Sequence, residues 1–344
     1  MPETPPLPTV APLDEAAVEA AQARWATRAK PPGSLGQLED VAVRLSGICG
    51  QCPPPIVARP AVVVFAGDHG VVADGASAWP SDITGLMVHA MAGEVAAINT
   101  FATTVGAEVH LVDVGVAADL THLEGVRHRK VRPGTDSLTS GPAMTLDDAR
   151  AAIDVGLDLA AELIADGVDC LVAGDMGIGN TTPSAVLIGR FTGSRADKVT
   201  GTGAGLPAER LGSKVAIVDA ALERAQAIDD PLTVLAEVGG LEIAAMAGLY
   251  IGAASAGVPF IIDGVIAAAA AVTADALVPG TAARGIAGHL STEPAATVAL
   301  EHLGLEPLLD LRLRLGEGTG ACLAIPLVQA AARALAHMAD LPEA

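Results

Sequence analysis

From residue 61 onwards, short apolar runs that end in glycine and aspartate alternate with stretches typical of helices. The clearest runs occupy residues 61–70, 109–115, 169–180 and 258–264. Strands that are apolar throughout are buried on both faces, and helices supply the crossover connections that parallel strands need. The pattern therefore predicts an α/β fold, a doubly wound and mostly parallel sheet with helices on both faces.

Each apolar run carries an aspartate at or near its end. In open parallel sheets, ligands bind beyond the carboxyl ends of the strands, so residues at those ends converge on one crevice. We therefore expect four aspartates to surround a common site, namely Asp68, Asp113, Asp175 and Asp263.

Both ends of the chain are helical in pattern. Two helices are expected over 14–27 and 35–48, before the first strand, and a long Ala/Leu helix follows a glycine-rich turn within 311–339. These helices are expected to pack together as a small second domain. The predicted boundaries are a flexible tail at 1–13, the helical part of the small domain at 14–58, the α/β domain at 59–310, and a catalytic loop and returning helix at 311–344.

The charge of the chain argues against a nucleic-acid partner. Acidic residues outnumber basic ones by 40 to 20, which gives a formal net charge of −20. Nucleic acids are bound by basic patches, and no Lys/Arg-rich run interleaved with aromatic residues occurs here.

Cysteine and histidine patterns give no support for a metal or redox cofactor. Cys49 and Cys52 are the only closely spaced cysteines, and zinc would need a second ligand pair. The eight histidines form no H-E-x-x-H pattern. The proline-rich, acidic N-terminus lacks the basic start and apolar core of an export signal, so we expect a cytoplasmic protein with reduced thiols.

One uncharged segment, residues 243–262, is long enough to cross a bilayer, for which roughly 20 residues are needed. It is interrupted at Gly257 and Pro259, and no Lys or Arg lies between Arg224 and Arg284 to anchor it. We therefore expect a buried helix followed by a buried strand, without membrane insertion.

Three glycine- and hydroxyl-rich motifs are typical of anion binding. GDMGIGNTTPSA (174–185) follows a strand and opens a helix, where backbone N–H groups can approach a phosphate closely. It is not a Walker P-loop, and an ordinary strand-to-helix turn would explain it equally well. TGTGAGL (200–206) precedes Lys214, one of only four lysines, and GHLSTEPAA (288–296) offers Ser291 as a neutral donor or a helix cap.

The motif LGEGTGA (315–321) isolates a carboxylate, Glu317, between two glycines before an apolar helix. Such a glutamate is often only a favourable charge near a helix start. The alternative is a general base, which needs a carboxylate held in a defined position beside the substrate.

Taken together, these motifs closely resemble the nicotinate-nucleotide:dimethylbenzimidazole phosphoribosyltransferase family, which builds the nucleoside phosphate of the lower cobalamin ligand. The resemblance covers nearly the whole chain after the tail. It rests on KPPGSLGQLE (30–39), AGDHGVV (66–72), DVGV (113–116), GDMGIGNTT (174–182), GTGAGL with Lys214, IIDG (261–264), GHLSTEP (288–294) and RLGEGTGA (314–321).

The resemblance implies a doubly wound α/β domain with a small helical domain, a homodimer, and no metal or redox cofactor. It implies transfer of the 5-phosphoribosyl group from nicotinate mononucleotide to 5,6-dimethylbenzimidazole or a related base, which yields α-ribazole 5′-phosphate and nicotinate. Glu317 matches the catalytic base. The nicotinate mononucleotide site is matched by Gly174, Asp175, Gly177, Ile178, Gly179, Asn180, Gly203, Lys214 and Ser291.

The aromatic base is expected to lie against Ser77, Leu86, Met176 and Leu315, with Asp68 and Asp263 as further acids of the crevice. The family often carries a glutamine where Gly85 and Leu86 stand here, so the acceptor base stays open. Three other functions also stay open: a transferase of this family with a different acceptor, a nucleosidase that uses water, and a nucleotide-binding sensor without turnover.

Overall fold

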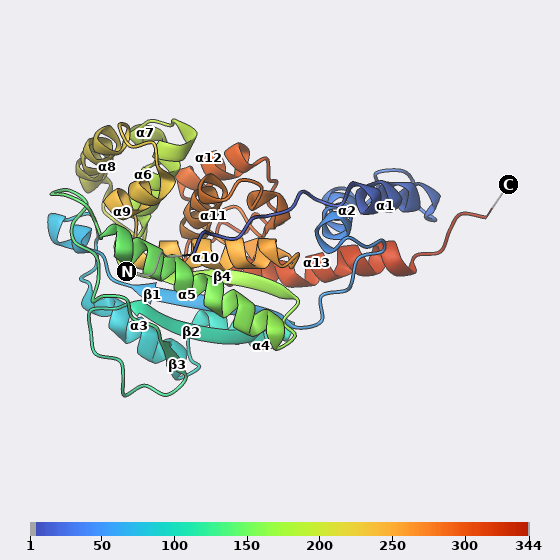
Figure 1. Ribbon diagram of the computed structural model, residues 1–344, viewed down its shortest axis with the longest axis horizontal. Coiled ribbons are helices and arrows are strands. Elements are labelled where there is room, and N and C mark those ends of the chain that lie inside the picture. Colours follow the sequence, from blue (N-terminus) through green and yellow to red (C-terminus); the bar gives the residue numbers. More distant parts are fainter. Residues whose placement is uncertain (1–4, 343–344) are drawn as a thin grey trace.

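The computed structural model describes residues 5–342, and its centre is a six-stranded parallel sheet (Figure 1). The strand order is β3-β2-β1-β4-β5-β6, so the connections wind outward in both directions from β1 and β4. In such a sheet the crevice for a ligand lies where the winding direction reverses. The strands are β1 (Pro60–Gly67), β2 (Glu108–Gly115), β3 (Val126–His128), β4 (Cys170–Met176), β5 (Phe260–Ile262) and β6 (Gly285–Ala287).

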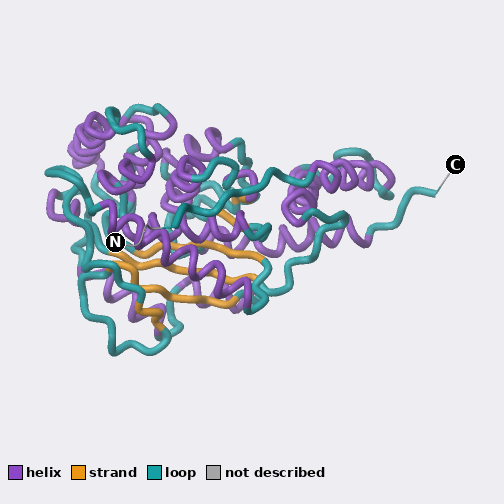
Figure 2. Tube along the Cα trace, in the orientation of Figure 1, coloured by secondary structure: helices purple, strands orange, loops and turns teal. Residues whose placement is uncertain are grey.

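Helices cover both faces of the sheet, as the tube view makes clear (Figure 2). The α-helices are α1 (Glu15–Thr27), α2 (Gln37–Cys49), α3 (Asp82–Ala92), α4 (Ala97–Val105), α5 (Leu146–Ala165), α6 (Thr181–Thr192), α7 (Ala196–Val199), α8 (Leu211–Ala225), α9 (Pro231–Val238), α10 (Leu241–Ser255), α11 (Val265–Leu277), α12 (Pro294–Leu303) and α13 (Thr319–His337). Short 3₁₀ turns occupy Gly70–Asp74, Ala208–Arg210 and Ala282–Arg284. The predicted doubly wound α/β fold is confirmed.

The alternation of side chains along β1 divides the core into two layers. Val63 and Phe65 point into the layer that includes α5, α10 and α11, whereas Val62 and Val64 point into the layer with α3, α4 and α13. All four side chains are fully buried, which explains why the strand is apolar throughout.

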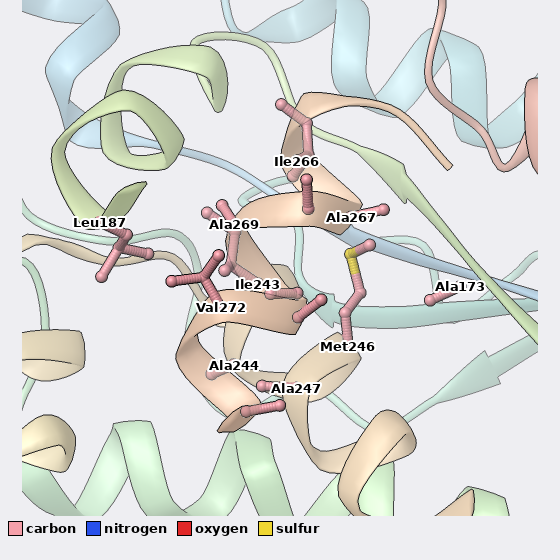
Figure 3. Packing of buried hydrophobic residues seen from close by; sticks show 14 of the residues in the cluster. Ala173, Leu187, Ile243, Ala244, Met246, Ala247, Ile266, Ala267, Ala269 and Val272 are labelled. Carbon is pink, nitrogen blue, oxygen red and sulfur yellow. The ribbon is translucent and has the colours of Figure 1, made fainter. Parts of the chain in front are cut away.

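The uncharged segment 243–262 lies inside the protein, as expected. It forms most of α10 and then β5, and both elements are buried. Figure 3 shows α10 side chains such as Met246 packed against α11, α6 and β4. By length and composition, α13 is apolar enough to cross a membrane, but 56% of its most apolar window is buried within the described residues.

The two ends of the chain meet in a small helical domain, as predicted. α1 and α2 pack against the distal half of α13 (Figure 1). The buried Arg28 donates to the carbonyl oxygens of Leu335 at 2.9 Å and Met338 at 2.7 Å, which satisfies backbone groups at the C-terminal end of α13. The exact domain boundaries stay a prediction.

Three details differ from the sequence expectations or go beyond them. The short strands β3 and β6 were not predicted, because neither lies in a continuous apolar run like the one that indicated the equally short β5. Within the expected tail, residues 5–13 have no helix or strand, but the Ala11 carbonyl accepts from Arg284 at 2.9 Å. Residues 1–4 and 343–344, at the outer ends of the predicted segments, lie outside the described residues.

The close contact between α5 and α10 can be tested by a substitution at Gly248. A side chain at Gly248 would place its Cβ 2.0 Å from the Ile153 carbonyl oxygen, so Gly248→Ala forces two backbones apart. We expect a loss of about 1–3 kcal/mol in the free energy of unfolding, measured by denaturant or thermal unfolding. Gly212→Ala in α8 is the matched control, since nothing lies within 4 Å of its added Cβ, and its stability should be unchanged or higher. Equal stability of both variants would contradict this account of the helix contact.

Candidate active site

A hollow lies at the carboxyl ends of β4, β5 and β6, beside the point where the winding of the sheet reverses. A second, smaller hollow adjoins it, because the two share residues of the turn that opens α6. Of the residues predicted from the sequence, the first hollow is lined by Asp175, Met176, Gly177, Ile178, Asn180, Gly203, Ser291 and Leu315, and the second adds Ser77, Gly179 and Lys214.

The turn between β4 and α6 is held tightly against the end of β1. A Cβ on Gly177 would lie 2.4 Å from the Gly67 carbonyl oxygen, and one on Gly179 would lie 2.7 Å from Val72. Within residues 5–342 the amides of Gly177 and Gly179 donate no hydrogen bond, whereas the Ile178 amide donates to Thr84 Oγ1 at 3.1 Å. The turn therefore keeps two N–H groups available at the N-terminus of α6, where an anion is favoured.

Lys214 reaches this turn from α8 and is buried. Its Nζ donates to Thr181 Oγ1 at 2.8 Å and to the Gly201 carbonyl oxygen at 3.0 Å. Burial lowers the pKa of Lys214 to about 8, although the nearby Glu293 carboxylate acts in the opposite direction. A buried ammonium at the opening of α6 is suited to a phosphate group.

Three charged or titratable residues that were not predicted from the sequence also line the main hollow: His289, Glu293 and Arg314. Glu293 accepts from the Gly203 amide at 2.9 Å, and Arg314 donates to the Gly203 carbonyl oxygen at 3.1 Å. All three lie inside motifs that carry the family resemblance. Their titratable side chains, within motifs rich in glycine and small polar residues, were the available signal.

Glu317 sits in a left-handed turn that seats it against the central strand. Gly316, Glu317 and Gly318 all have positive φ, at 85°, 62° and 82°. For a residue with a side chain this conformation costs about 1–2 kcal/mol, so surrounding contacts must hold it. The Glu317 amide donates to the Asp175 carbonyl oxygen at 3.1 Å, and a Cβ on Gly174 would lie 2.5 Å from the Glu317 backbone.

The carboxylate of Glu317 lies at the N-terminus of α4 and is 2% exposed. Its Oε2 accepts from the Ile98 amide at 3.3 Å, and Oε1 has no hydrogen bond within the described chain. Burial raises the pKa of Glu317, and the charge of Asp263 adds to the rise, while the Ile98 amide opposes it. The side chain is therefore a stronger base than an exposed glutamate.

Asp175 lies near the end of β4, Asp263 directly follows the neighbouring strand β5, and the two carboxylates affect each other. Burial raises the pKa of Asp175 well above its usual range, and the Asp263 charge is the next cause. Asp175 Oδ2 accepts from Asn180 Nδ2 at 2.9 Å. Asp263 Oδ1 accepts from the Ala321 amide at 2.8 Å and lies 3.2 Å from His289 Nε2.

A second histidine–carboxylate pair, also missed from sequence, lies beneath the Gly177 turn. His69 Nε2 is 2.7 Å from Glu242 Oε1, and both side chains are buried. Burial acts to lower the pKa of His69, but the charge and the hydrogen bond of Glu242, together with the charge of Asp68, outweigh it, and the pKa is raised. Glu242 is an isolated carboxylate in the otherwise apolar helix α10, and this was the sequence signal that could have revealed the pair.

The expected convergence of four aspartates is met only in part. Of the four, only Asp175 lines a hollow; Asp68, Asp113 and Asp263 line neither. Asp113 Oδ2 lies 3.2 Å from Lys130 Nζ, and Asp68 Oδ2 accepts from the Ala117 amide at 2.8 Å. Asp68 follows β1 and Asp113 lies near the end of β2, on the other side of the reversal point. Both accept from backbone amides of the loop after β2, at Ala117 and Val116.

The four residues expected around the aromatic base do not lie together in the structure. Met176 and Leu315 line the main hollow, but Ser77 lines the smaller one with Lys214, on the side expected for the phosphate. Leu86 lies on α3, is 62% exposed and borders neither hollow. Gly174, expected at the nucleotide, instead provides the space for the Glu317 turn.

Comparisons with known proteins agree with this geometry. The model of the family described as phosphoribosyltransferase matches residues 10–344. The nicotinate-nucleotide–dimethylbenzimidazole phosphoribosyltransferases of Salinispora tropica and Thermus thermophilus are 48% and 47% identical, covering 97% and 96% of this chain and 96% and 98% of those proteins. The crystal structure of CobT from Thermus thermophilus matches with a TM-score of 0.91 and 47% identity, covering 94% of this chain and 97% of that one. The chain therefore belongs to the phosphoribosyltransferase family that these relatives represent.

Proposed function

We propose that this enzyme transfers the 5-phosphoribosyl group of nicotinate mononucleotide to 5,6-dimethylbenzimidazole or a related base. The products are α-ribazole 5′-phosphate and nicotinate, for assembly of the cobalamin nucleotide loop. The observation that carries the proposal is the buried Glu317 carboxylate. Glu317 itself lines neither hollow, but it directly follows Leu315 and Gly316 of the main one, and the linings of the two hollows offer phosphate donors. Membership of the family, and the names of relatives that match nearly end to end, support it.

The chemistry requires one base and no acid. Nicotinate is a cationic pyridinium while it is attached to ribose, so it leaves neutral at nitrogen. A benzimidazole that attacks C1′ through one ring nitrogen becomes cationic unless its other nitrogen loses a proton, and a carboxylate beside that N–H accepts it. Attack opposite the nicotinate converts the β-linkage into an α-linkage, through an oxocarbenium-like transition state.

We assign these roles to the described residues as follows. The phosphate would bind the amides of Gly177 and Gly179 with Lys214, and Gly203 and Ser291 would complete the nucleotide side. The acceptor base would lie against Met176 and Leu315, with its N–H toward Glu317 Oε1. Because the Ile98 amide already engages Oε2, Oε1 is available to take the proton.

We also propose that the protein is a cytoplasmic homodimer that acts on small molecules. Large apolar side chains remain exposed on segments near the site, and Trp79, Leu86, Val95 and Leu315 are each more than half exposed. Exposed apolar surface of this kind favours association with a second copy. Sedimentation of the pure protein would give its oligomeric state.

The acceptor and the reaction class are tested together by product analysis. The pure protein is incubated with nicotinate mononucleotide and a panel of benzimidazoles, purines and phenols, and the products are identified by mass. An α-linked riboside phosphate supports the transferase and identifies its acceptor. Release of ribose phosphate alone would instead identify a nucleosidase, and no turnover would identify a binding protein.

Glu317→Gln keeps the size and hydrogen bonding of the side chain but removes its basicity. We expect kcat to fall roughly 10²–10⁴-fold, equivalent to about 3–5 kcal/mol of barrier, with folding and nucleotide binding kept. An N-methylated benzimidazole has no ring proton to give up, so the variant should lose little with that acceptor. Near-normal rates with the unmodified base would mean that the carboxylate serves only as a cap for α4.

The same residue predicts the pH dependence. Glu317 acts as a base only when ionised, and burial raises its pKa, so activity should fall as the pH decreases through a value above that of an ordinary glutamate. Profiles of kcat against pH for the wild type and Glu317→Gln would check this. An unchanged acidic limb in the variant would assign the titration to another carboxyl group, such as Asp175.

Lys214→Met keeps the aliphatic stem and removes the charge. A hydrogen bond to a charged group contributes about 1.5–3 kcal/mol, so the dissociation constant for nicotinate mononucleotide should rise roughly 10–100-fold by calorimetry. Lys198→Met is the matched control, because Lys198 is exposed on α7. Equal affinities of the two variants would remove Lys214 from the phosphate site.

A further inference from the structure

We propose that Asp263 and His289 form a positioning pair that links the nucleotide hollow to the turn that presents Glu317. The proposal rests on the proposed function, since it treats Glu317 as the base. Neither side chain is expected to react with the substrates. Their role is to hold the first turn of α13, and with it the residues directly before that helix.

Asp263 supplies the cap that α13 lacks in its own sequence. The N-cap residue of α13 is Gly318, which has no side chain to accept from the exposed helix amides. Asp263 follows β5, and its Oδ1 accepts from the Ala321 amide at 2.8 Å, so a carboxylate from the sheet edge performs this task. A negative charge at a helix N-terminus is also favoured by the helix dipole.

His289 connects this cap to the hollow. Its Nε2 lies 3.2 Å from the same Asp263 oxygen, and the residue lines the hollow assigned to the nucleotide. The imidazole also packs against the start of α13, because a Cβ on Gly320 would lie 2.0 Å from its Cδ2 atom. Its Nδ1 is buried without a hydrogen-bond partner in the described chain.

The turn that carries Glu317 needs such support. Three successive residues with positive φ precede α13, and the middle one is Glu317. The strain of that conformation is offset by contacts on both sides: the Asp175 carbonyl oxygen before the helix and the Asp263 carboxylate within its first turn. Weakening the contact with the Asp263 carboxylate would let the turn relax and move the Glu317 carboxylate away from the acceptor base.

The test combines Asp263→Asn with Glu317→Gln in a double-mutant cycle. Asparagine keeps an oxygen for the Ala321 amide but loses the charge, so kcat should fall roughly 10–100-fold, as small misplacements of catalytic groups do. KM and the calorimetric affinity for nicotinate mononucleotide should change by less than about threefold. In the Glu317→Gln background the same substitution should cost less than about threefold, because no base remains to be positioned.

A second set of variants keeps the test decisive if Asp263→Asn does not fold. His289→Gln retains a donor for Asp263 and His289→Ala does not, so the alanine variant should lose more of its kcat than the glutamine variant. His110→Gln is the matched control, because His110 also lies near a carboxylate, Glu108, but on β2 and outside both hollows. Its kcat should equal that of the wild type.

The possible failures are distinguishable. If Glu317→Gln is slow but Asp263→Asn keeps the wild-type kcat, or if Asp263→Asn costs the same in both backgrounds, the positioning pair is overturned while the proposed function stands. Equal kcat values for His289→Gln and His289→Ala would also overturn it. If Glu317→Gln turns over at the wild-type rate, the base role fails, and the positioning pair fails with it.

Discussion

The site depends on one close contact between backbones, where the Gly316–Gly318 turn lies on residue 174 of the central strand. No side chain fits at Gly174, since its Cβ would meet the Glu317 carbonyl oxygen at 2.5 Å. This contact joins the C-terminal helix to β4 and brings the Glu317 amide to the Asp175 carbonyl oxygen. The glycines of the site therefore act mainly by letting separate segments approach each other, before any ligand is considered.

The same region concentrates charge that a protein interior normally excludes. Glu242, Asp263 and Glu317 are each no more than 2% exposed. Burial of a carboxylate costs several kcal/mol unless it is paired or protonated, and two of these acids are paired with His69 and His289. Such an arrangement sacrifices stability to keep reactive groups in fixed positions, as expected for an active site rather than a structural core.

Periodicity and turn chemistry were enough to predict the sheet, the buried helix α10 and the helices at the two ends of the chain, because each depends on local pattern. The turn after β4 and the position of Glu317 also followed from local signals. What could not be predicted depends on contacts between distant segments: Ser77 folds back toward Lys214, and Asp113 pairs with Lys130. His289 and Glu242 were missed because a single polar residue in an apolar run does not reveal its partner.

The path of α13 gives the molecule a mechanical property. The helix begins two residues after Glu317 and ends where Arg24 and Arg28 of the small domain bind its last carbonyl oxygens. A helix of 19 residues is about 28 Å long, and this one continues through an interior proline, Pro326. Because this one helix joins the small domain to the Glu317 turn, we expect a truncation, fusion or crosslink that displaces the small domain to shift the Glu317 carboxylate at the other end.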